Sequence, residues 1–460
     1  MKKNLFFFLL STTSFLLNAQ TEGSAFNLTG GSGLATVFST DYQAIGVNPA
    51  NIPCDTSHHI ALGIGEAGFS FFSNALLKDE VRDVIFNNKD SLSDEQQMDF
   101  GQAFVENGVT FHADVRVIGL SFKLGKNAGL ALSFDGRSSY YSKLGEKASE
   151  FIFNGYDFTT LVDTVIISPV DSFGVIDPPI NLSEILNGTS FRFNVRSDIN
   201  LAFGTQLFAL DNIQVFGGVG LKYILGFAYL DLETTENTVT GVSALGLGLF
   251  DLTASDTPSE IILETFKPVG TGFGVDVGTH INIGEKISLA VSVVDIGKMK
   301  YTANVLQLED AEIDTIFFTG VTTTDPIELL TEVLQDENVI SYSGATDFEV
   351  NLPTTLRLGA GVQVTDFLKA GIDVVAPFND VAGAYENALL GVGAELTAAK
   401  FLKLSAGTTI GGGYDFNLSA GIALDFDFWE IGIASRDIIT LFGQASPTVS
   451  MAVGVLRFKI

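Results

Sequence analysis

The chain has 460 residues, a formal net charge of −29 and 46% hydrophobic residues, with 39 Phe and one Trp. The strongly negative charge disfavours nucleic acid and other polyanions as partners. Beyond the N-terminus no apolar run approaches the roughly 18 residues of a membrane-spanning helix, so the hydrophobicity fits either a large soluble β protein or an outer-membrane barrel.

The first nineteen residues have the pattern of a cleaved signal peptide. Lys2 and Lys3 precede an apolar stretch from Leu5 to Leu17, and Ala19 supplies the small residue of a cleavage site. We therefore assign residues 1–19 to a signal peptide. Cys54 is the only cysteine, so no disulfide forms within the chain, and we interpret it as a small buried or turn residue.

The stretch "YQAIGVNPANI" (42–52) precedes the first strand-like run and has the composition of a turn. Gly tolerates a positive φ, Asn nearly does, and Pro fixes its own φ near −65°. We predict a compact turn at Gly46, Asn48, Pro49 and Ala50.

Hydrophobic alternation predicts long strands. In "FRFNVRSDINLAFGTQLF" (191–208), Phe193, Leu201 and their neighbours at every second position are apolar, whereas Arg192 and Asn200 belong to a polar face. This alternation holds for roughly 17 residues, whereas strands of soluble proteins average about five or six. A soluble sandwich and a membrane barrel both alternate, so this pattern alone does not separate them.

The spacing of the strands favours the barrel. Fourteen strand-like runs are predicted near 58–72, 108–124, 128–142, 190–208, 212–231, 270–283, 286–301, 352–365, 368–377, 387–397, 401–410, 414–426, 428–436 and 448–460. Connections after odd-numbered strands are mostly long, and those after even-numbered strands are short. This alternation is typical of outer-membrane barrels. We predict an all-β fold, a transmembrane antiparallel barrel of about fourteen strands, with the alternating segment "SMAVGVLRFKI" (450–460) closing against the first strand.

If the apolar face meets lipid, the polar face lines the lumen. The predicted luminal charged and polar residues are His112, Asp114, Arg116, Asp135, Arg137, Arg192, Arg196, Asp198, Asp276, Arg357, Lys369, Asp373, Glu395, Asp425, Asp427 and Arg436. Opposite charges in a narrow lumen can pair with each other, which favours a structural network, and a polar permeation path is the alternative. Glycines on this face leave room for a plug inside the barrel or ease the curvature of the strands.

The segment "AIGVNPANI" resembles the Asn-Pro-Ala segment of the FadL superfamily of outer-membrane barrels. Residues 270–301 and 352–377 resemble the PorV-like branch, accessory barrels of the type IX secretion system, and related barrels. The resemblance implies that residues 20–56 form a hatch inside a barrel built from 57–460, with long extracellular loops. Few charges between residues 22 and 55 make burial of that segment inexpensive.

The resemblance implies a non-enzymatic protein of the Gram-negative outer membrane, surrounded by lipid. We expect an accessory or docking subunit of a protein machine for secretion or barrel assembly, with protein partners. The alternative is a passive uptake channel for a hydrophobic small molecule. We find no Gly-x-Ser-x-Gly elbow, and His58 and His59 point to opposite strand faces beside Cys54, so we expect no catalytic residue, metal or cofactor. The acidic long loops are either a solvated surface or a site for divalent cations or a cationic partner.

Overall fold

The computed structural model describes residues 29–30, 32–55, 57–73, 101–102, 104–105, 108–154, 162–167, 172–235, 238–246, 259–260, 267–310, 312–316, 341–385, 387–439 and 448–460. The predicted signal peptide, residues 1–19, lies outside them. Within these residues no helix has both the length and the apolar character needed to cross a bilayer.

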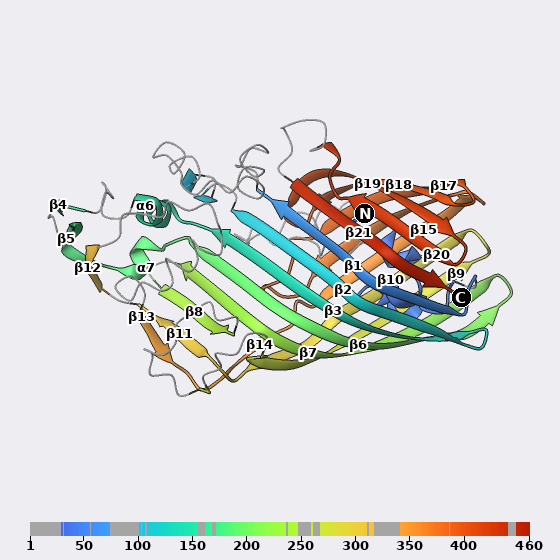
Figure 1. Ribbon diagram of the computed structural model, residues 1–460, viewed down its shortest axis with the longest axis horizontal. Helices are drawn as coiled ribbons and strands as arrows, with labels where there is room; N and C mark the ends of the chain where they lie inside the picture. The colour runs from blue at the N-terminus through green and yellow to red at the C-terminus, as the bar shows by residue number, and fades with distance from the viewer. Residues whose placement is uncertain are drawn as a thin grey trace, which may run out of the picture.

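A closed antiparallel barrel of fourteen strands dominates the described part of the chain, which confirms the predicted fold (Figure 1). The barrel strands are β1 (Ile60–Phe72), β2 (Val109–Leu124), β3 (Ala128–Lys143), β6 (Ser190–Leu210), β7 (Ile213–Thr235), β9 (Gly270–Ile283), β10 (Ile287–Tyr301), β15 (Thr355–Thr365), β16 (Leu368–Pro377), β17 (Leu389–Ala399), β18 (Leu402–Gly411), β19 (Tyr414–Phe426), β20 (Trp429–Ser435) and β21 (Thr448–Lys459). The last strand pairs with the first, from Ala61↔Lys459 to Phe72↔Thr448. This closure, predicted from the alternation of 450–460, removes the sheet edges.

The barrel is apolar outside and polar inside. On β6, Ile199 and Leu201 are 46% and 42% exposed, whereas Asp198 and Asn200, which alternate with them, are 0% and 1% exposed. A soluble protein would bury the aliphatic residues instead. An apolar outer surface with charged residues inside is the arrangement that a lipid environment stabilises.

The long connections contain further elements, gathered at the end of the barrel opposite the short turns (Figure 1). They are α6 (Glu146–Asn154), β4 (Thr164–Ile167), β5 (Ser172–Asn181), α7 (Leu182–Ile185), β8 (Thr238–Leu245), β11 (Val305–Glu309), β12 (Glu312–Ile316), β13 (Ser341–Gly344) and β14 (Phe348–Asn351). Strands β4, β5 and β12 form a separate sheet, and β8, β11 and β13 extend the barrel ladder. We call these elements the outer layer. The sequence analysis treated these stretches as loops.

The outer layer has its own hydrophobic core. Phe151 and Ile152 of α6 and Leu182 and Ile185 of α7 are almost fully buried, and they belong to one cluster that also takes in side chains of the upper barrel wall. Burial of such side chains stabilises by about 1.5–3 kcal/mol each. The outer layer is therefore a packed structure.

Residues 29–30 and 32–55, here called the inner segment, lie within the barrel. They include α3 (Ala35–Phe38) and two short 3₁₀ helices, η1 (Asp41–Ala44) and η2 (Pro49–Asn51). In Figure 1 this dark blue segment lies among the strands near the end with the short turns.

The barrel wall carries a glycine against this segment on each of ten strands. A Cβ at these positions would lie between 1.9 and 2.8 Å from an atom of residues 32–52. They are Gly63, Gly119, Gly129, Gly204, Gly218, Gly278, Gly359, Gly371, Gly393 and Gly407. The absence of a side chain is what lets the wall and the segment approach so closely.

The remaining four strands contact the inner segment through side chains. Ser292 of β10 donates a hydrogen bond to the Val47 carbonyl, and Ser419 of β19 donates one to the Ser32 hydroxyl. Ala434 of β20 packs against Gly30, and Arg457 of β21 binds Asp41. Residues 30–52 thus touch every strand of a closed ring, which is possible only from inside it.

Candidate functional site

The predicted turn at Gly46–Ala50 is seated against β7 and β9. Gly46 has a φ of +74°, which favours glycine. The Asn48 carboxamide accepts a hydrogen bond from the Ala50 amide at 3.1 Å and donates to the Thr279 carbonyl at 3.2 Å. Pro49 begins η2, where its missing N–H costs nothing.

Asn51, which belongs to the turn stretch 42–52, organises the inner segment. Its side-chain nitrogen donates to the carbonyls of Thr36, Val37 and Ser39 at 2.9, 3.3 and 3.0 Å. Its side-chain oxygen hydrogen-bonds His280 Nδ1 on β9 at 2.8 Å. One buried side-chain amide therefore supplies hydrogen bonds to three backbone carbonyls of the irregular inner segment and links the segment to the barrel wall.

A buried charge network, here called the central network, crosses the lumen. It joins Arg137, Arg196 and Lys222 to Asp198, Asp276 and Asp295. The Nε atoms of Arg137 and Arg196 lie 3.4 and 3.3 Å from Asp198, and Lys222 binds both Asp276 and Asp295. Three positive and three negative groups offset one another, which is what allows charges to be buried.

Asp295 holds this network together, and the alternation pattern did not predict it. The strand pairing slips between Val293 and Ile296, and Asp295 itself has a φ of +58°. Such a bulge re-aims a side chain, so counting every second residue fails there. Lys222 was also missed, although it alternates with the exposed Leu221 and Tyr223 and could have been found.

The other predicted luminal residues form smaller groups. Arg116 pairs with Asp135 at 2.8 Å, and Lys369 pairs with Glu395 at 2.9 Å. Arg192 contacts Asp231, Glu233 and Asp380 near the outer layer. Asp373 accepts a hydrogen bond from the Thr36 amide, and Arg357 donates one to the Tyr385 hydroxyl. Arg436 is buried. Asp427 is instead exposed in the turn before β20, with a φ of +49°, because the alternation ends there.

A second network, here called the lower network, lies toward the short turns. Arg457 binds Asp41 of the inner segment at 2.6 Å and Glu430 of β20 at 2.7 Å. Lys403 and Lys459 bind Asp425 at 2.6 and 2.8 Å. The pairing of Asp41 with Arg457 joins residues far apart in the chain, so no local pattern could have predicted it.

Asp41 is held in its charged form. Burial by itself would raise the pKa of its carboxyl group, but the Arg457 charge and hydrogen bonds from His58, Gln43 and Arg457 lower it below 3.8. The ionised Asp41 therefore fastens η1 to the last strand of the barrel.

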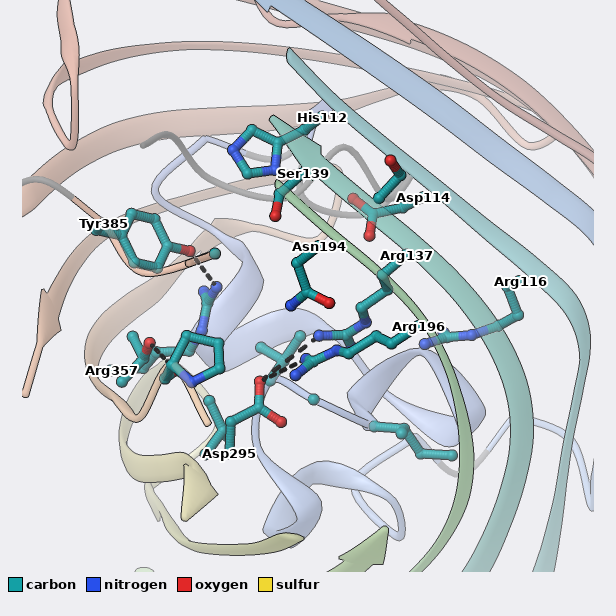
Figure 2. Close-up of a pocket in the computed structure, with 18 residues that line it drawn as sticks. His112, Asp114, Arg116, Arg137, Ser139, Asn194, Arg196, Asp295, Arg357 and Tyr385 are labelled. Carbon is teal, nitrogen blue, oxygen red and sulfur yellow. Dashed lines mark hydrogen bonds and ion pairs between the residues drawn. The ribbon is translucent and has the colours of Figure 1, made fainter. Parts of the chain in front are cut away.

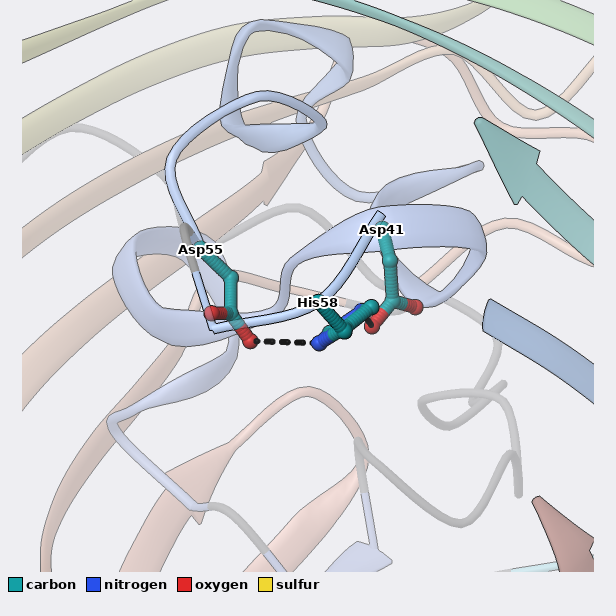
Figure 3. A group of neighbouring side chains, drawn as sticks. All are labelled: Asp41, Asp55 and His58. Atoms are coloured by element: carbon teal, nitrogen blue, oxygen red, sulfur yellow. Dashed lines mark ion pairs between the residues drawn. The ribbon is translucent and has the colours of Figure 1, made fainter. Parts of the chain in front are cut away.

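Asp41, Asp55 and His58 have oxygen and nitrogen atoms within 4.8 Å of one another (Figure 3). Asp41 is already bonded to Arg457, Asp55 accepts from the Ser57 amide, and His58 Nδ1 hydrogen-bonds the Ser57 hydroxyl. These contacts within the protein explain the cluster: it links the inner segment to the residues that precede β1.

A polar cavity of about 110 Å³ lies between the inner segment and the wall (Figure 2). Gly46 and Val47 form part of its lining. Its charged lining residues are Asp114, Arg116, Arg137, Arg196, Asp295 and Arg357. Asn194 and Tyr385 add an amide and a phenol, so the cavity suits a polar group better than a hydrocarbon.

The pairing of β1 with β21 is interrupted locally. The pairs of β1 with β21 include Ile64↔Leu456 and Ala67↔Val453 but none at Gly65 or Glu66. Gly65 has a φ of +70°, and the carbonyl of Val455 opposite accepts from the Trp429 indole. Inside this gap, Glu66 accepts a hydrogen bond from the Tyr42 hydroxyl at 2.5 Å.

The sequence matches the family described as "Family of unknown function (DUF5723)" over residues 49–435. No curated protein matches it. Among solved structures, the chain is similar to the Ralstonia pickettii toluene transporter TbuX, at 12% identity and a TM-score of 0.46, over 96% of this chain and 99% of that one.

The Pseudomonas putida toluene transporter TodX is similar at 11% identity and a TM-score of 0.42, over 96% of this chain and 98% of that one. A Pseudomonas aeruginosa FadL homologue is similar at 10% identity and a TM-score of 0.40, over 96% and 97%. Likenesses this weak carry no conclusion about function.

Proposed function

Because the chain belongs to the DUF5723 family, a family of unknown function, we propose its function from its own geometry. We propose that it is an outer-membrane barrel with a closed lumen that acts as an accessory or docking subunit of a larger protein assembly, for secretion or barrel assembly. The observation that carries the proposal is the inner segment, which contacts all fourteen strands.

In this proposal the inner segment is a hatch. Its glycine contacts hold it against ten strands of the wall, and the central and lower networks place paired charges in the lumen. A wide aqueous pore needs an unoccupied lumen, so a role as a general porin is disfavoured. Assignment to the PorV-like branch stays a prediction.

The outer layer supplies the proposed docking surface. A passive pore does not need a second sheet and a separate hydrophobic core above its mouth, whereas a subunit that holds a partner needs a rigid, structured face. Burial of Phe151 and Ile152 in that core is the support for such rigidity.

A matched pair of variants tests docking. Phe151→Ser disrupts the outer core, and Leu132→Ala removes a lipid-facing side chain of β3 without touching the outer layer. Each protein is purified in mild detergent from its native membranes, and co-purifying proteins are identified by mass spectrometry. We expect a stoichiometric partner with the wild type and Leu132→Ala but not with Phe151→Ser, while all three barrels stay folded. Recovery of the wild-type barrel alone would contradict docking.

The ladder gap at Gly65 favours a second candidate, passive uptake of a hydrophobic small molecule. An interruption in the wall is a place where a lipid-soluble ligand could pass sideways between lumen and bilayer. Uptake predicts that cross-linking β1 to β21 with cysteines at Ala67 and Val453, the pair next to the gap, abolishes entry of a hydrophobic solute. Unchanged entry after cross-linking would exclude this route.

A further inference from the structure

The lining of the cavity in Figure 2 carries more positively than negatively charged groups, and Asp135 and Asp198, which do not line it, pair with three of its arginines. Four arginines, Arg116, Arg137, Arg196 and Arg357, face two aspartates, Asp114 and Asp295. Arginine presents planar N–H donors that match a carboxylate or phosphate in two parallel hydrogen bonds.

One buried donor on a side chain that lines this cavity has no hydrogen-bond partner among the described residues. It is Nη1 of Arg196, a residue that is 4% exposed. Figure 2 shows the Asn194 side chain in the same space as the arginine groups. Because buried donors are rarely left unpaired, an acceptor that is not part of the described chain should satisfy this one.

The cavity's size limits what that group can be. A cavity of about 150 Å³ holds one benzene ring, so a volume of about 110 Å³ holds a group of a few heavy atoms. Phosphate and carboxylate groups have this size, and both match the arginine donors.

We propose that this cavity binds one small anionic group, a carboxylate or a phosphate, held by Arg196 and its neighbouring arginines. Gly46 and Val47 of the inner segment line the same cavity, so the bound anion contacts the inner segment as well as the wall. The site does not depend on the docking role, because its residues belong to the barrel, the inner segment and the connections before β15 and after β16.

Isothermal titration calorimetry of the full-length protein in detergent micelles tests the site, with inorganic phosphate and acetate as separate probes at constant chloride. We expect saturable binding of at least one probe with one site per chain. Binding of phosphate alone would assign a phosphate ligand, and binding of acetate alone a carboxylate. No saturable binding of either probe would overturn the proposal.

Matched variants locate the site. Arg196→Gln removes a lining arginine, whereas Arg192→Gln removes an equally buried arginine of the same strand that does not line the cavity. We expect at least tenfold weaker binding for Arg196→Gln and unchanged binding for Arg192→Gln. Equal loss in both would overturn the assignment.

A nearly isosteric variant keeps the test valid if Arg196→Gln fails to fold. Asn194→Asp places a negative charge in the cavity, so it should abolish anion binding and leave the unfolding midpoint unchanged or higher. Retained binding, or a lowered midpoint, would contradict a positively charged cavity.

Discussion

Gly218 of β7 offers a direct test of how the inner segment closes the lumen. Its α-carbon faces η2, and a Cβ built there would lie 2.3 Å from the Ala50 nitrogen and 2.3 Å from the Pro49 carbonyl carbon. Both are backbone atoms, so no side-chain rotation relieves the contact. Gly218→Ala should therefore push the turn away from the wall.

The size of the effect follows from the cost of overpacking. Forcing an extra methyl group into a packed site costs about 1–3 kcal/mol. If that cost falls on the seated state of the inner segment, the ratio of unseated to seated molecules rises about 5- to 150-fold. We expect channel openings in planar bilayers to become more frequent by a factor in this range, while the barrel stays folded.

Gly217→Ala is the matched control. The added Cβ would meet the end of the flexible Leu207 side chain at 2.9 Å, away from the inner segment. It should leave conductance at the wild-type level. Equal conductance in both variants and the wild type, with Gly218→Ala folded, would refute the argument that close packing at Gly218 holds the segment in place.

Three further predictions concern charge and assembly. Asp295→Asn leaves the cations of the central network without one of their anionic partners, so it should lower the free energy of unfolding in urea by about 3–5 kcal/mol. Lys298→Gln, at an exposed ion pair, should change that free energy by less than about 1 kcal/mol. Equal effects would contradict a buried network. The pKa of Asp41 is lowered below 3.8, so its bond to Arg457 stabilises the seated inner segment above that pH and is lost as the pH falls through the lowered pKa. Acid should therefore raise the conductance of the wild type. The conductance of Arg457→Gln should not rise in acid, because that variant lacks the bond at every pH. Deleting residues 456–460 removes four of the ten pairs that close β21 onto β1 and should prevent membrane insertion. Normal insertion, seen as heat-modified gel mobility, would refute that role.

Sequence alone located the barrel strands because period-two alternation persists over each of them. β9, β16 and β19 have the bounds predicted for them, and most other barrel strands end within three residues of the prediction. The outer layer was missed because most of its strands have only four or five residues, and β4 is exposed at every residue, so little alternation distinguishes them from loops.

The lumen was predictable only where the alternation was regular. Arg196 and Asp198 were found from the polar face of β6, but Asp295 was hidden by a bulge. The contact of Asp41 with Arg457 depends on how the inner segment folds back, which no local pattern encodes. The glycines on the polar face did carry a usable signal, because a narrow lumen needs them wherever another backbone approaches.

The central claim is that the inner segment closes the lumen, and planar-bilayer recording tests it most directly. The full-length protein is compared with a variant that lacks residues 22–50, after both are shown to be folded barrels by their heat-modified gel mobility. The account predicts that the full-length protein stays silent and the deletion variant conducts ions. A deletion variant as silent as the full-length protein would contradict the account, because the wall charges or the outer layer would then close the lumen.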